Sequence, residues 1–353
     1  MDREDPRSLP TYRSGDHGDV MIDHQPGGTP ILPPSNTQTV ADLGEFAVID
    51  RCVRGRIQPP STLLGPGDDA AVVAAPDSRV VATTDVLVEG VHFRLDWSSA
   101  EQVGRKAIAQ NAADVAAMGA VSTAFLVGLG CPASTPVAVV DGLVQGMWTE
   151  ADALGAGIVG GDVVRAQHIV ISVTALGDLG GRAPVTRSGA TDGDVVALAG
   201  RLGWSAAGLA VLSRGFRAPA AVVFAHRVPE PPYAAALTAA LAGATSMTDV
   251  SDGLLADLSH VAQASAVAMD VHRDALRPHQ RLVEVGSALG VDPWTWVLTG
   301  GEDHAFVATF PGAQALPEGW VKIGTVASGS GVRVGGVEWP AEDGPTGWLA
   351  FGK

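Results

Sequence analysis

The stretch that decides the fold reads Gly65-Pro66-Gly67-Asp68-Asp69-Ala70-Ala71-Val72-Val73, and Val80-Val81-Ala82-Thr83-Thr84-Asp85 follows it closely. The first piece is typical of an acidic turn that enters a strand, and the second is typical of a strand that ends on Thr-Thr-Asp. We therefore expect the carboxylates of both pieces to meet at one edge of a sheet. Because carboxylate oxygens are preferred ligands of Mg²⁺, this stretch predicts a magnesium site.

A helix is expected after this stretch, with an amide and an acid on an apolar face. The stripe along it advances by four, three and four residues through Ala107, Asn111, Asp114 and Met118. Residues at this spacing share one face of a helix. Its ends carry capping signals, namely Ser98 or Ser99 with Glu101 or Gln102 at the start and Gly119 at the end. A carboxylate among apolar neighbours needs a partner, and with few Lys or Arg residues nearby a divalent cation is expected beside Asp114.

Length and charge limit the classes of protein that this chain can represent. The chain has 353 residues, which favours two domains over one. Its 38 acidic and 23 basic residues give a net charge of -15, which argues against a protein that binds nucleic acid through the phosphates. The acidic excess also suits the recruitment of cations, although solubility alone explains it.

Cysteine content and hydropathy indicate the compartment. Cys52 and Cys131 are the two cysteines of the chain, too few for a disulfide framework or a Cys-based metal cluster. No apolar run approaches the length that spans a bilayer, and the N-terminus lacks the pattern of a signal peptide. We therefore expect a cytoplasmic protein without a membrane partner.

The order of periodic segments predicts an α+β protein built from two α/β layer domains. Residues 1–40 mix Asp, Arg, Gly and Pro without a hydrophobic period, and we read them as a disordered N-terminal extension. Residues 41–180 hold the expected first domain and residues 181–353 the expected second domain. After the Val80 strand, the expected elements are strands at 122–129, 156–162, 168–176 and 194–199 and helices at 136–154 and from Ser205.

Three further acidic corners follow along the chain. They are Gly160-Gly161-Asp162, Asp249 with Ser251-Asp252-Gly253, and Gly300-Gly301-Glu302-Asp303, the last expected to end a strand at 296–299. Each corner alone is an ordinary turn. Capping of the next helix explains Ser251 and Asp252, but it does not explain Asp249. Five such corners in one chain together indicate a site that binds metal and phosphate.

Three other residues have two interpretations each. Arg187 is either a solvated charge or, at a domain junction, a partner for a phosphate. His92 is more simply a packed or surface imidazole than a ligand contact. Trp348 is more often a core or interface anchor, although an exposed indole also stacks on heterocycles.

The sequence lacks the motifs of familiar nucleotide enzymes. It contains no Gly-x-x-x-x-Gly-Lys-Ser/Thr loop and no Gly-x-Gly-x-x-Gly that opens a βαβ unit. A protein that binds a nucleotide without a lysine-bearing loop must neutralise the phosphates in another way. Several Mg²⁺ ions held by carboxylates would do so.

Seven segments resemble, in the same order, those of the thiamine-monophosphate kinase family. They are Leu64-Gly65-Pro66-Gly67-Asp68-Asp69-Ala70-Ala71, Thr84-Asp85-Val86-Leu87-Val88-Glu89-Gly90-Val91-His92-Phe93, Asn111-Ala112-Ala113-Asp114-Val115-Ala116-Ala117-Met118-Gly119-Ala120, Gly160-Gly161-Asp162, Thr186-Arg187-Ser188-Gly189, Ser251-Asp252-Gly253-Leu254 and Thr299-Gly300-Gly301-Glu302-Asp303. The resemblance covers nearly everything from Asp42 to Phe351. The chain departs from the family pattern at His304-Ala305-Phe306, where a tyrosine and an acid are frequent, and at Val163-Val164, where hydroxyl residues are frequent.

The resemblance implies ATP-dependent phosphorylation of thiamine monophosphate to thiamine diphosphate. It also implies the fold of the aminoimidazole ribonucleotide synthetase-like superfamily, with two α/β domains and N-terminal domains that pair across a homodimer. By motif position, Mg²⁺ ions would be held by Asp69, Thr83, Thr84, Asp85, Asp114, Asp162, Asp249 and Asp252. ATP would contact Gly161, Asp162, Arg187 and Ser251, and the thiamine phosphate would contact His92, Glu302 and Trp348.

The chemistry of these residues agrees with phosphoryl transfer, which depends on in-line positioning and charge neutralisation more than on a strong base. The acceptor is a phosphate oxygen that is already anionic, so no general base is required. We expect Asp85, Asp114 and Arg187 to be catalytic, with Mg²⁺ between the two phosphates and Arg187 on the transferring group. Direct transfer without a phosphoenzyme follows.

Two alternative functions have distinct signatures. The first is another ATP-dependent synthetase of the same superfamily. A chain that resembles its selenium enzyme would carry a reactive Cys or selenocysteine near the N-terminal glycine-rich segment, and one that resembles its hydrogenase-maturation protein would carry a C-terminal Cys. Cys52 and Cys131 lie elsewhere. The second is a non-catalytic module that binds divalent cations and consumes no ATP.

Overall fold

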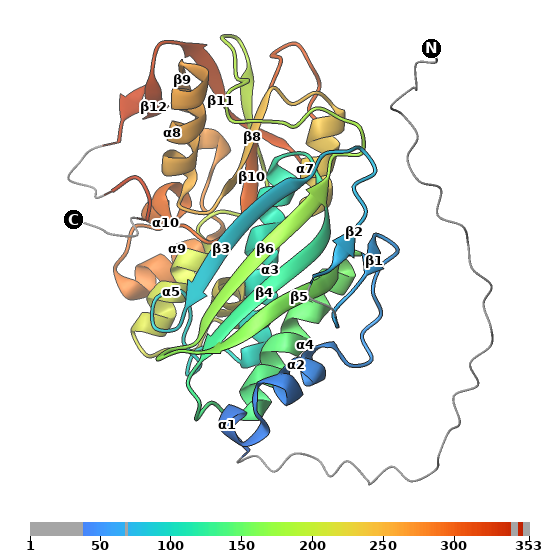
Figure 1. Cartoon of the computed structure of the whole chain (residues 1–353). Coiled ribbons are helices and arrows are strands. Elements are labelled where there is room, and N and C mark those ends of the chain that lie inside the picture. Colours follow the sequence, from blue (N-terminus) through green and yellow to red (C-terminus); the bar gives the residue numbers. More distant parts are fainter. Residues whose placement is uncertain (1–37, 68–69, 340–344, 349–353) are drawn as a thin grey trace, which may run out of the picture. The chain divides into compact units, whose positions relative to one another are not determined.

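The structure is a computed structural model that describes residues 38–67, 70–339 and 345–348 (Figure 1). The chain divides into two units, Met1–Ser35 and Asn36–Lys353, and every element below belongs to the second. The expected extension at 1–40 therefore lies almost wholly outside the described residues, and so does Asp69. Where the description begins, Thr39 already forms an isolated bridge with Pro136.

The first layer is a four-stranded sheet in the order β3-β6-β4-β5. Its strands are β3 (Val81–Val88), β6 (Val170–Asp178), β4 (Val121–Cys131) and β5 (Gly157–Arg165). The β4–β5 pair is parallel, and the other two pairs are antiparallel. Helices α3 (Ala100–Ala117) and α4 (Val137–Ala153) pack against each other and against one face of this sheet. This sheet and its two helices form the first half of the described structure. The apolar core of the first half lies between the helices and the sheet face that they cover.

The two helices approach closely because each presents a glycine to the other. A Cβ on Gly104 of α3 would lie 2.0 Å from the carbonyl oxygen of Leu143, and a Cβ on Gly146 of α4 would lie 1.9 Å from the carbonyl oxygen of Glu101. Such distances are far inside van der Waals contact, so any larger residue would push the helices apart. This close packing fixes the position of α3, which carries Asp114.

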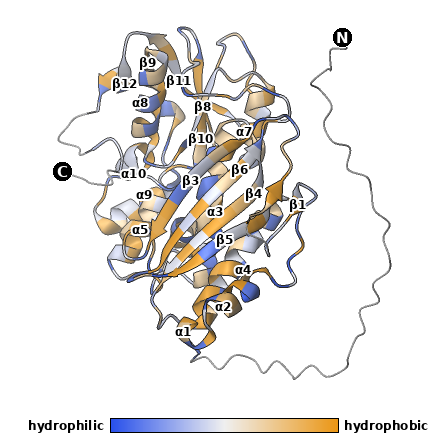
Figure 2. Ribbon diagram, in the orientation of Figure 1, coloured by the Kyte–Doolittle hydropathy of each residue, from blue (hydrophilic) through white to orange (hydrophobic). Residues whose placement is uncertain are grey.

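The other face of the sheet is not covered by helices of the described chain. Strand β3 alternates, with Thr83 and Asp85 toward α3 and Thr84 and Val86 toward the uncovered face. Figure 2 shows hydrophobic residues along the strands of this sheet. Among the exposed apolar side chains on these strands are Val86, Leu126 and Val164.

Small elements precede this layer in the chain. They are α1 (Val40–Leu43), α2 (Glu45–Val53), β1 (Thr62–Leu64) and β2 (Val72–Val73). Strands β1 and β2 form an antiparallel pair of their own. Helix α2 contacts α4 and β5, so these elements extend the first half.

The second half is built on a seven-stranded sheet in the order β13-β12-β9-β11-β7-β10-β8. Its strands are β7 (Val195–Ala199), β8 (Ser246–Val250), β9 (Val267–Val271), β10 (Ala305–Phe310), β11 (Val321–Ser328), β12 (Gly331–Val334) and β13 (Val337–Glu338). Its helices are α5 (Trp204–Ser213), α6 (Ala220–Arg227), α7 (Tyr233–Leu241), α8 (Leu254–Ser265), the 3₁₀ helix η1 (Arg273–Ala275), α9 (Gln280–Leu289) and α10 (Pro293–Thr299). Helix α8 packs on β8, β9 and β12, and α3 contacts β8, so the site carried by α3 faces this half.

Most expected elements are confirmed within one to three residues. The helix with Asn111 and Asp114 is α3, which begins with a capping box formed by Ser99 and Gln102 and is followed by Gly119 at φ +73°. The strand expected to end at Asp85 is longer than expected, because β3 continues through the apolar residues Val86-Leu87-Val88. Asp85 therefore lies in the middle of a strand rather than at its end.

Two local expectations are wrong. Residues 296–299 belong to helix α10 rather than to a strand, since Asp292 caps that helix and Pro293 occupies its first turn. A short apolar run does not distinguish a strand from a helix by periodicity. Ser251 is also not the N-cap of the next helix, because α8 begins at Leu254 after Gly253.

Candidate active site

A cavity of about 620 Å³ opens where α3 and β3 meet the second half. It is lined from the first half by Asp85, His92, Gln110 and Asp114, and from the second half by Arg187, Ser205, His226, Ser251, Asp252, Glu302, His304 and Trp348. Eight residues proposed from the sequence for metal, nucleotide or substrate thus meet around one space: Asp85, His92, Asp114, Arg187, Ser251, Asp252, Glu302 and Trp348.

Asp85 is held in place by the polar stripe of α3. Its backbone N–H donates to Oδ1 of Asn111 at 2.9 Å, and its carboxylate accepts from Nε2 of Gln110 at 3.2 Å. Asn111 is itself fixed, because its Nδ2 donates to the carbonyl oxygen of Ala107 at 2.9 Å. One turn further along the same helix, Asp114 accepts from Oγ1 of Thr83 at 2.9 Å. The stripe thus anchors the strand and aims two carboxylates at the cavity.

The carboxylates of the cavity repel one another. Burial and the nearby charges of Asp249 and Asp85 raise the pKa of Asp114 to about 7. Burial and Asp249 also raise the pKa of Asp85, although His304 opposes this change. Asp114 therefore keeps its proton to a higher pH in the absence of a cation, and a divalent cation would relieve the repulsion. The donor set therefore fits Mg²⁺, which prefers carboxylate oxygens.

Asp249 lies on β8 and has a histidine partner. Its Oδ2 lies 3.0 Å from Nδ1 of His304, and both side chains are buried. Burial opposes the charged imidazolium, but the hydrogen bond and charge of Asp249 raise the pKa of His304 above its ordinary value. His304 begins the His304-Ala305-Phe306 segment that departs from the family pattern, and no motif predicted its pairing with Asp249.

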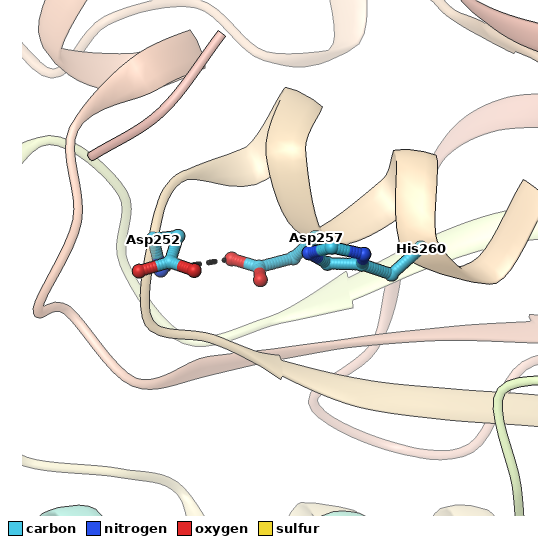
Figure 3. Close-up of side chains that lie close together, drawn as sticks. All are labelled: Asp252, Asp257 and His260. Carbon is cyan, nitrogen blue, oxygen red and sulfur yellow. Dashed lines mark hydrogen bonds between the residues drawn. The ribbon is translucent and has the colours of Figure 1, made fainter. Parts of the chain in front are cut away.

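A second acidic group adjoins the cavity at the start of α8. Ligand atoms of Asp252, Asp257 and His260 all lie within 4.8 Å of one another (Figure 3). Asp257 accepts from the backbone N–H groups of Asp252 at 3.1 Å and Gly253 at 3.0 Å, the capping role that the sequence suggested for Ser251. Burial and Asp249 raise the pKa of Asp257 to about 7. Sequence reasoning missed Asp257 and His260, although their spacing on α8 places them on one helix face.

The expected substrate residues surround one end of the cavity. Trp348 is half exposed, its ring centroid lies 5.9 Å from that of His92, and its backbone N–H donates to the carbonyl oxygen of Asp252 at 2.9 Å. His92 accepts from the backbone N–H of Val88 at 3.0 Å through Nδ1, so its ring is oriented by its own turn. Glu302 completes this wall and is held by Lys106, whose Nζ lies 2.9 Å from its Oε1.

Arg187 also lines the cavity, as Ser251 does. Its Nε donates to Oγ1 of Thr248 at 3.3 Å. No carboxylate of the described residues forms an ion pair with Arg187, so its charge is available to an anion.

The structure does not bring Gly161, Asp162 and Thr84 into this cavity. Strands β3 and β5 form opposite edges of the first sheet, as Figure 1 shows, and three strand spacings amount to about 14 Å. Across the sheet, Asp162 is in register with Gly128, which pairs with Ser172, which pairs with Val86. Asp162 therefore shares the uncovered face with Val86 and Thr84, whereas Asp85 points toward α3. The hydroxyl of Thr84 donates to the carbonyl oxygen of Val173 at 3.0 Å.

The fold and the site define an AIR synthase related protein. The family models of the N-terminal and C-terminal domains of AIR synthase related proteins match residues 67–179 and 191–334, respectively. Hydrogenase maturation protein HypE of E. coli shares this fold at a TM-score of 0.65 and 19% identity, covering 82% of this chain and 92% of its own.

Closer relatives define the family within this class. Thiamine-monophosphate kinase of Mycobacterium tuberculosis (strain H37Rv) is 56% identical over 321 residues, which cover 90% of this chain and 95% of the relative. The Corynebacterium glutamicum enzyme of the same name is 45% identical over 82% of this chain and 87% of its own. A solved structure of AaThiL complexed with AMPPCP and TMP aligns at a TM-score of 0.73 and 31% identity, covering 90% of this chain and 100% of its own. The chain belongs to the thiamine-monophosphate kinase family.

Proposed function

We propose that this protein transfers the γ-phosphoryl group of ATP to thiamine monophosphate and forms thiamine diphosphate and ADP. The observation that carries the proposal is the cavity itself, because Asp85, Asp114 and Asp252 line it together with Arg187 and Glu302. The proposed metal ligands, the guanidinium of Arg187 and the expected substrate residues thus line one space. The structure of the related AaThiL with AMPPCP and TMP supports the same pair of substrates.

Each group of the cavity has a role in this reaction. Asp85 and Asp114 would hold Mg²⁺, together with Asp249, Asp252 and Thr83, whose hydroxyl donates to Asp114. When bound, Mg²⁺ supplies positive charge between two phosphates that otherwise repel each other. Asp69, which the resemblance adds to this set, lies outside the described residues.

Arg187 would stabilise the charge that develops on the transferring group, because its guanidinium has no acidic partner among the described residues. Ser251, beside it, would contact the nucleotide. The acceptor oxygen belongs to a phosphate and is already anionic, so the residues of the cavity need not remove a proton from it. We therefore propose direct transfer with no phosphorylated residue.

We further propose that two copies pair through the uncovered face of the first sheet. Supporting this, the exposed side chains of Val86, Leu126 and Val164 are apolar, and unpartnered apolar surface of this kind marks interfaces. Asp162 lies on the same face, away from Asp85 of its own chain. In a pair of copies, Asp162 and Gly161 would contact a nucleotide bound near the shared face. Their expected role in nucleotide binding then requires no movement of β5 toward the cavity of its own chain.

The compartment is also a proposal. Within the described residues no helix combines the length and the apolar composition needed to cross a membrane. Cys52 and Cys131 are free, which agrees with a reducing compartment. We place the reaction in the cytoplasm.

The test is an assay of the purified protein with ATP, Mg²⁺ and thiamine monophosphate, in which thiamine diphosphate and ADP are both quantified. Equal amounts of the two products are expected. Tight Mg²⁺ binding without ADP would instead support the cation-binding module, and ADP formed only with another acceptor would support a different synthetase of the superfamily. Loss of product after EDTA, with recovery on added Mg²⁺, checks the metal requirement.

A further inference from the structure

A buried lysine connects the two halves of the cavity wall. Lys106 lies on α3 with 2% of its surface exposed, and lysine is rarely buried to this extent without a partner. Its Nζ donates to Oε1 of Glu302 at 2.9 Å and to the carbonyl oxygen of His92 at 3.2 Å. One ammonium group from the first half therefore holds two substrate-facing residues, one in each half. The proposed reaction gives Lys106 no role so far.

The second oxygen of Glu302 has a different kind of partner. Oε2 lies 3.3 Å from Nδ1 of His226, which also lies 3.2 Å from Oγ of Ser205. Burial and the charge of Lys106 lower the pKa of His226 to about 4, so its imidazole is neutral near pH 7. The contact between His226 and Glu302 is then one between a neutral ring and a carboxylate. Lys106 is the charged partner in this group of four.

The ammonium of Lys106 also decides the protonation of Glu302. Burial favours the neutral acid, but the charge of Lys106 and its hydrogen bond to the carboxylate bring the pKa of Glu302 below its ordinary value. An ionised carboxylate only accepts hydrogen bonds. Glu302 therefore presents an acceptor to the cavity, beside the rings of His92 and Trp348. Such a wall suits a heteroaromatic ligand that carries N–H donors or positive charge.

The backbone at Glu302 needs this support. Glu302 has φ +64°, in the left-handed region that residues other than glycine seldom adopt, and its backbone N–H donates to the carbonyl oxygen of Ser251 at 2.8 Å. The next residue, Asp303, accepts from the backbone N–H of Ser205 at 2.8 Å. The loop is therefore fixed at the backbone, and the side chain of Glu302 is fixed by Lys106 and His226.

We propose that Lys106 is a positioning residue for substrate binding, which holds the carboxylate of Glu302 and the backbone of His92 in place, so that Glu302 and the His92 ring face the thiamine part of thiamine monophosphate. This inference rests on the proposed function and extends it to a residue that does not touch the substrate. Lys106 acts on the wall formed by Glu302, His92 and Trp348. Removal of the Lys106 side chain should therefore weaken the binding of thiamine monophosphate and leave the binding of ATP almost unchanged.

The test compares Lys106→Met with wild type, with Lys322→Met as the matched control, because Lys322 is exposed on β11. The KM for thiamine monophosphate is expected to rise about tenfold or more in Lys106→Met, as for a lost hydrogen bond to a charged group. The KM for ATP should change by less than about twofold, and Lys322→Met should match wild type. An equal rise in both KM values, or no rise in either, would overturn the inference.

A double-mutant cycle shows whether Lys106 acts through Glu302. Lys106→Met should add little to the effect of Glu302→Gln on the KM for thiamine monophosphate, whereas fully additive effects contradict the proposal. The double variant leaves no unpaired buried charge in the Lys106–Glu302 pair. If Lys106→Met alone fails to fold, the KM of the double variant for thiamine monophosphate is compared with that of Glu302→Gln instead. Wild type that forms no thiamine diphosphate refutes the proposed function itself. Wild type that turns over while Lys106→Met keeps its KM refutes only the role of Lys106.

Discussion

Replacing Asp114 with Asn should stabilise the metal-free protein while it abolishes turnover. In the structure, Asp114 lies near two other acids, Asp85 and Asp249, and its carboxylate accepts from Thr83. Asn keeps an oxygen that accepts from Thr83, but it carries no charge. The substitution therefore removes the repulsion and leaves the local hydrogen bond in place.

The magnitude follows from the pKa of Asp114, which is raised from 3.8 to about 7. Below pH 3.8 the acid is neutral in both the folded and unfolded chains, and it contributes no difference. As the pH rises toward 7, the unfolded chain loses its proton first, so wild type loses stability relative to Asn by about 1.4 kcal/mol for each pH unit. Above pH 7 the acid is ionised in both states, so the difference in stability no longer changes with pH. The difference amounts to about 4 kcal/mol or less, because the neighbouring acids and the solvent take up part of the effect.

The assay is urea denaturation of metal-free wild type and Asp114→Asn at several values between pH 5 and pH 8. The advantage of Asn in free energy of unfolding should grow from pH 5 to pH 7 and then level off. Added Mg²⁺ should stabilise wild type and have little effect on the variant, since ligands stabilise the state that binds them. An advantage that does not change with pH, or a variant less stable than wild type at pH 8, would refute the reasoning.

Three further perturbations test other parts of the molecule. Asp85→Asn should lower kcat by about 10²-fold or more in steady-state assays, with a melting temperature no lower than that of wild type, because the backbone N–H of residue 85, not its side chain, donates to Asn111. Leu126→Glu should turn the proposed dimer into monomers in analytical ultracentrifugation, while Leu241→Glu, exposed on α7, should not. Gly104→Ala should lower the free energy of unfolding by about 1–3 kcal/mol in urea titrations, because its methyl group meets the backbone of α4.

The sequence predicted the elements whose signals are local. The capping box of Ser99 and Gln102, the stripe through Asn111 and Asp114, and the glycine after the helix are short-range patterns, and the structure confirms all of them. Helix α10 was mistaken for a strand because a four-residue run is too short to show a period. The Asp292-Pro293 pair just before this run was the signal that indicated a helix.

The contacts across the cavity could not be predicted in the same way. Lys106 and Glu302 lie 196 residues apart, and His304 and Asp249 lie 55 residues apart, so no periodicity relates them. The spacing of Asp257 and His260 on α8 was visible in the sequence, but their proximity to Asp252 depends on how the chain turns at Gly253. The placement of Asp162 on the uncovered face follows from strand order, which local sequence patterns do not specify.

The central claim is that the carboxylates around Asp85 and Asp114 hold divalent cations between the two phosphates. Mn²⁺ bound to the protein with AMPPCP and thiamine monophosphate can be counted by electron paramagnetic resonance, in wild type and in Asp85→Asn. The claim predicts that wild type binds more Mn²⁺ when both phosphate ligands are present than with either alone, and that Asp85→Asn loses this additional metal. Equal Mn²⁺ binding by the two proteins under all three conditions would contradict it.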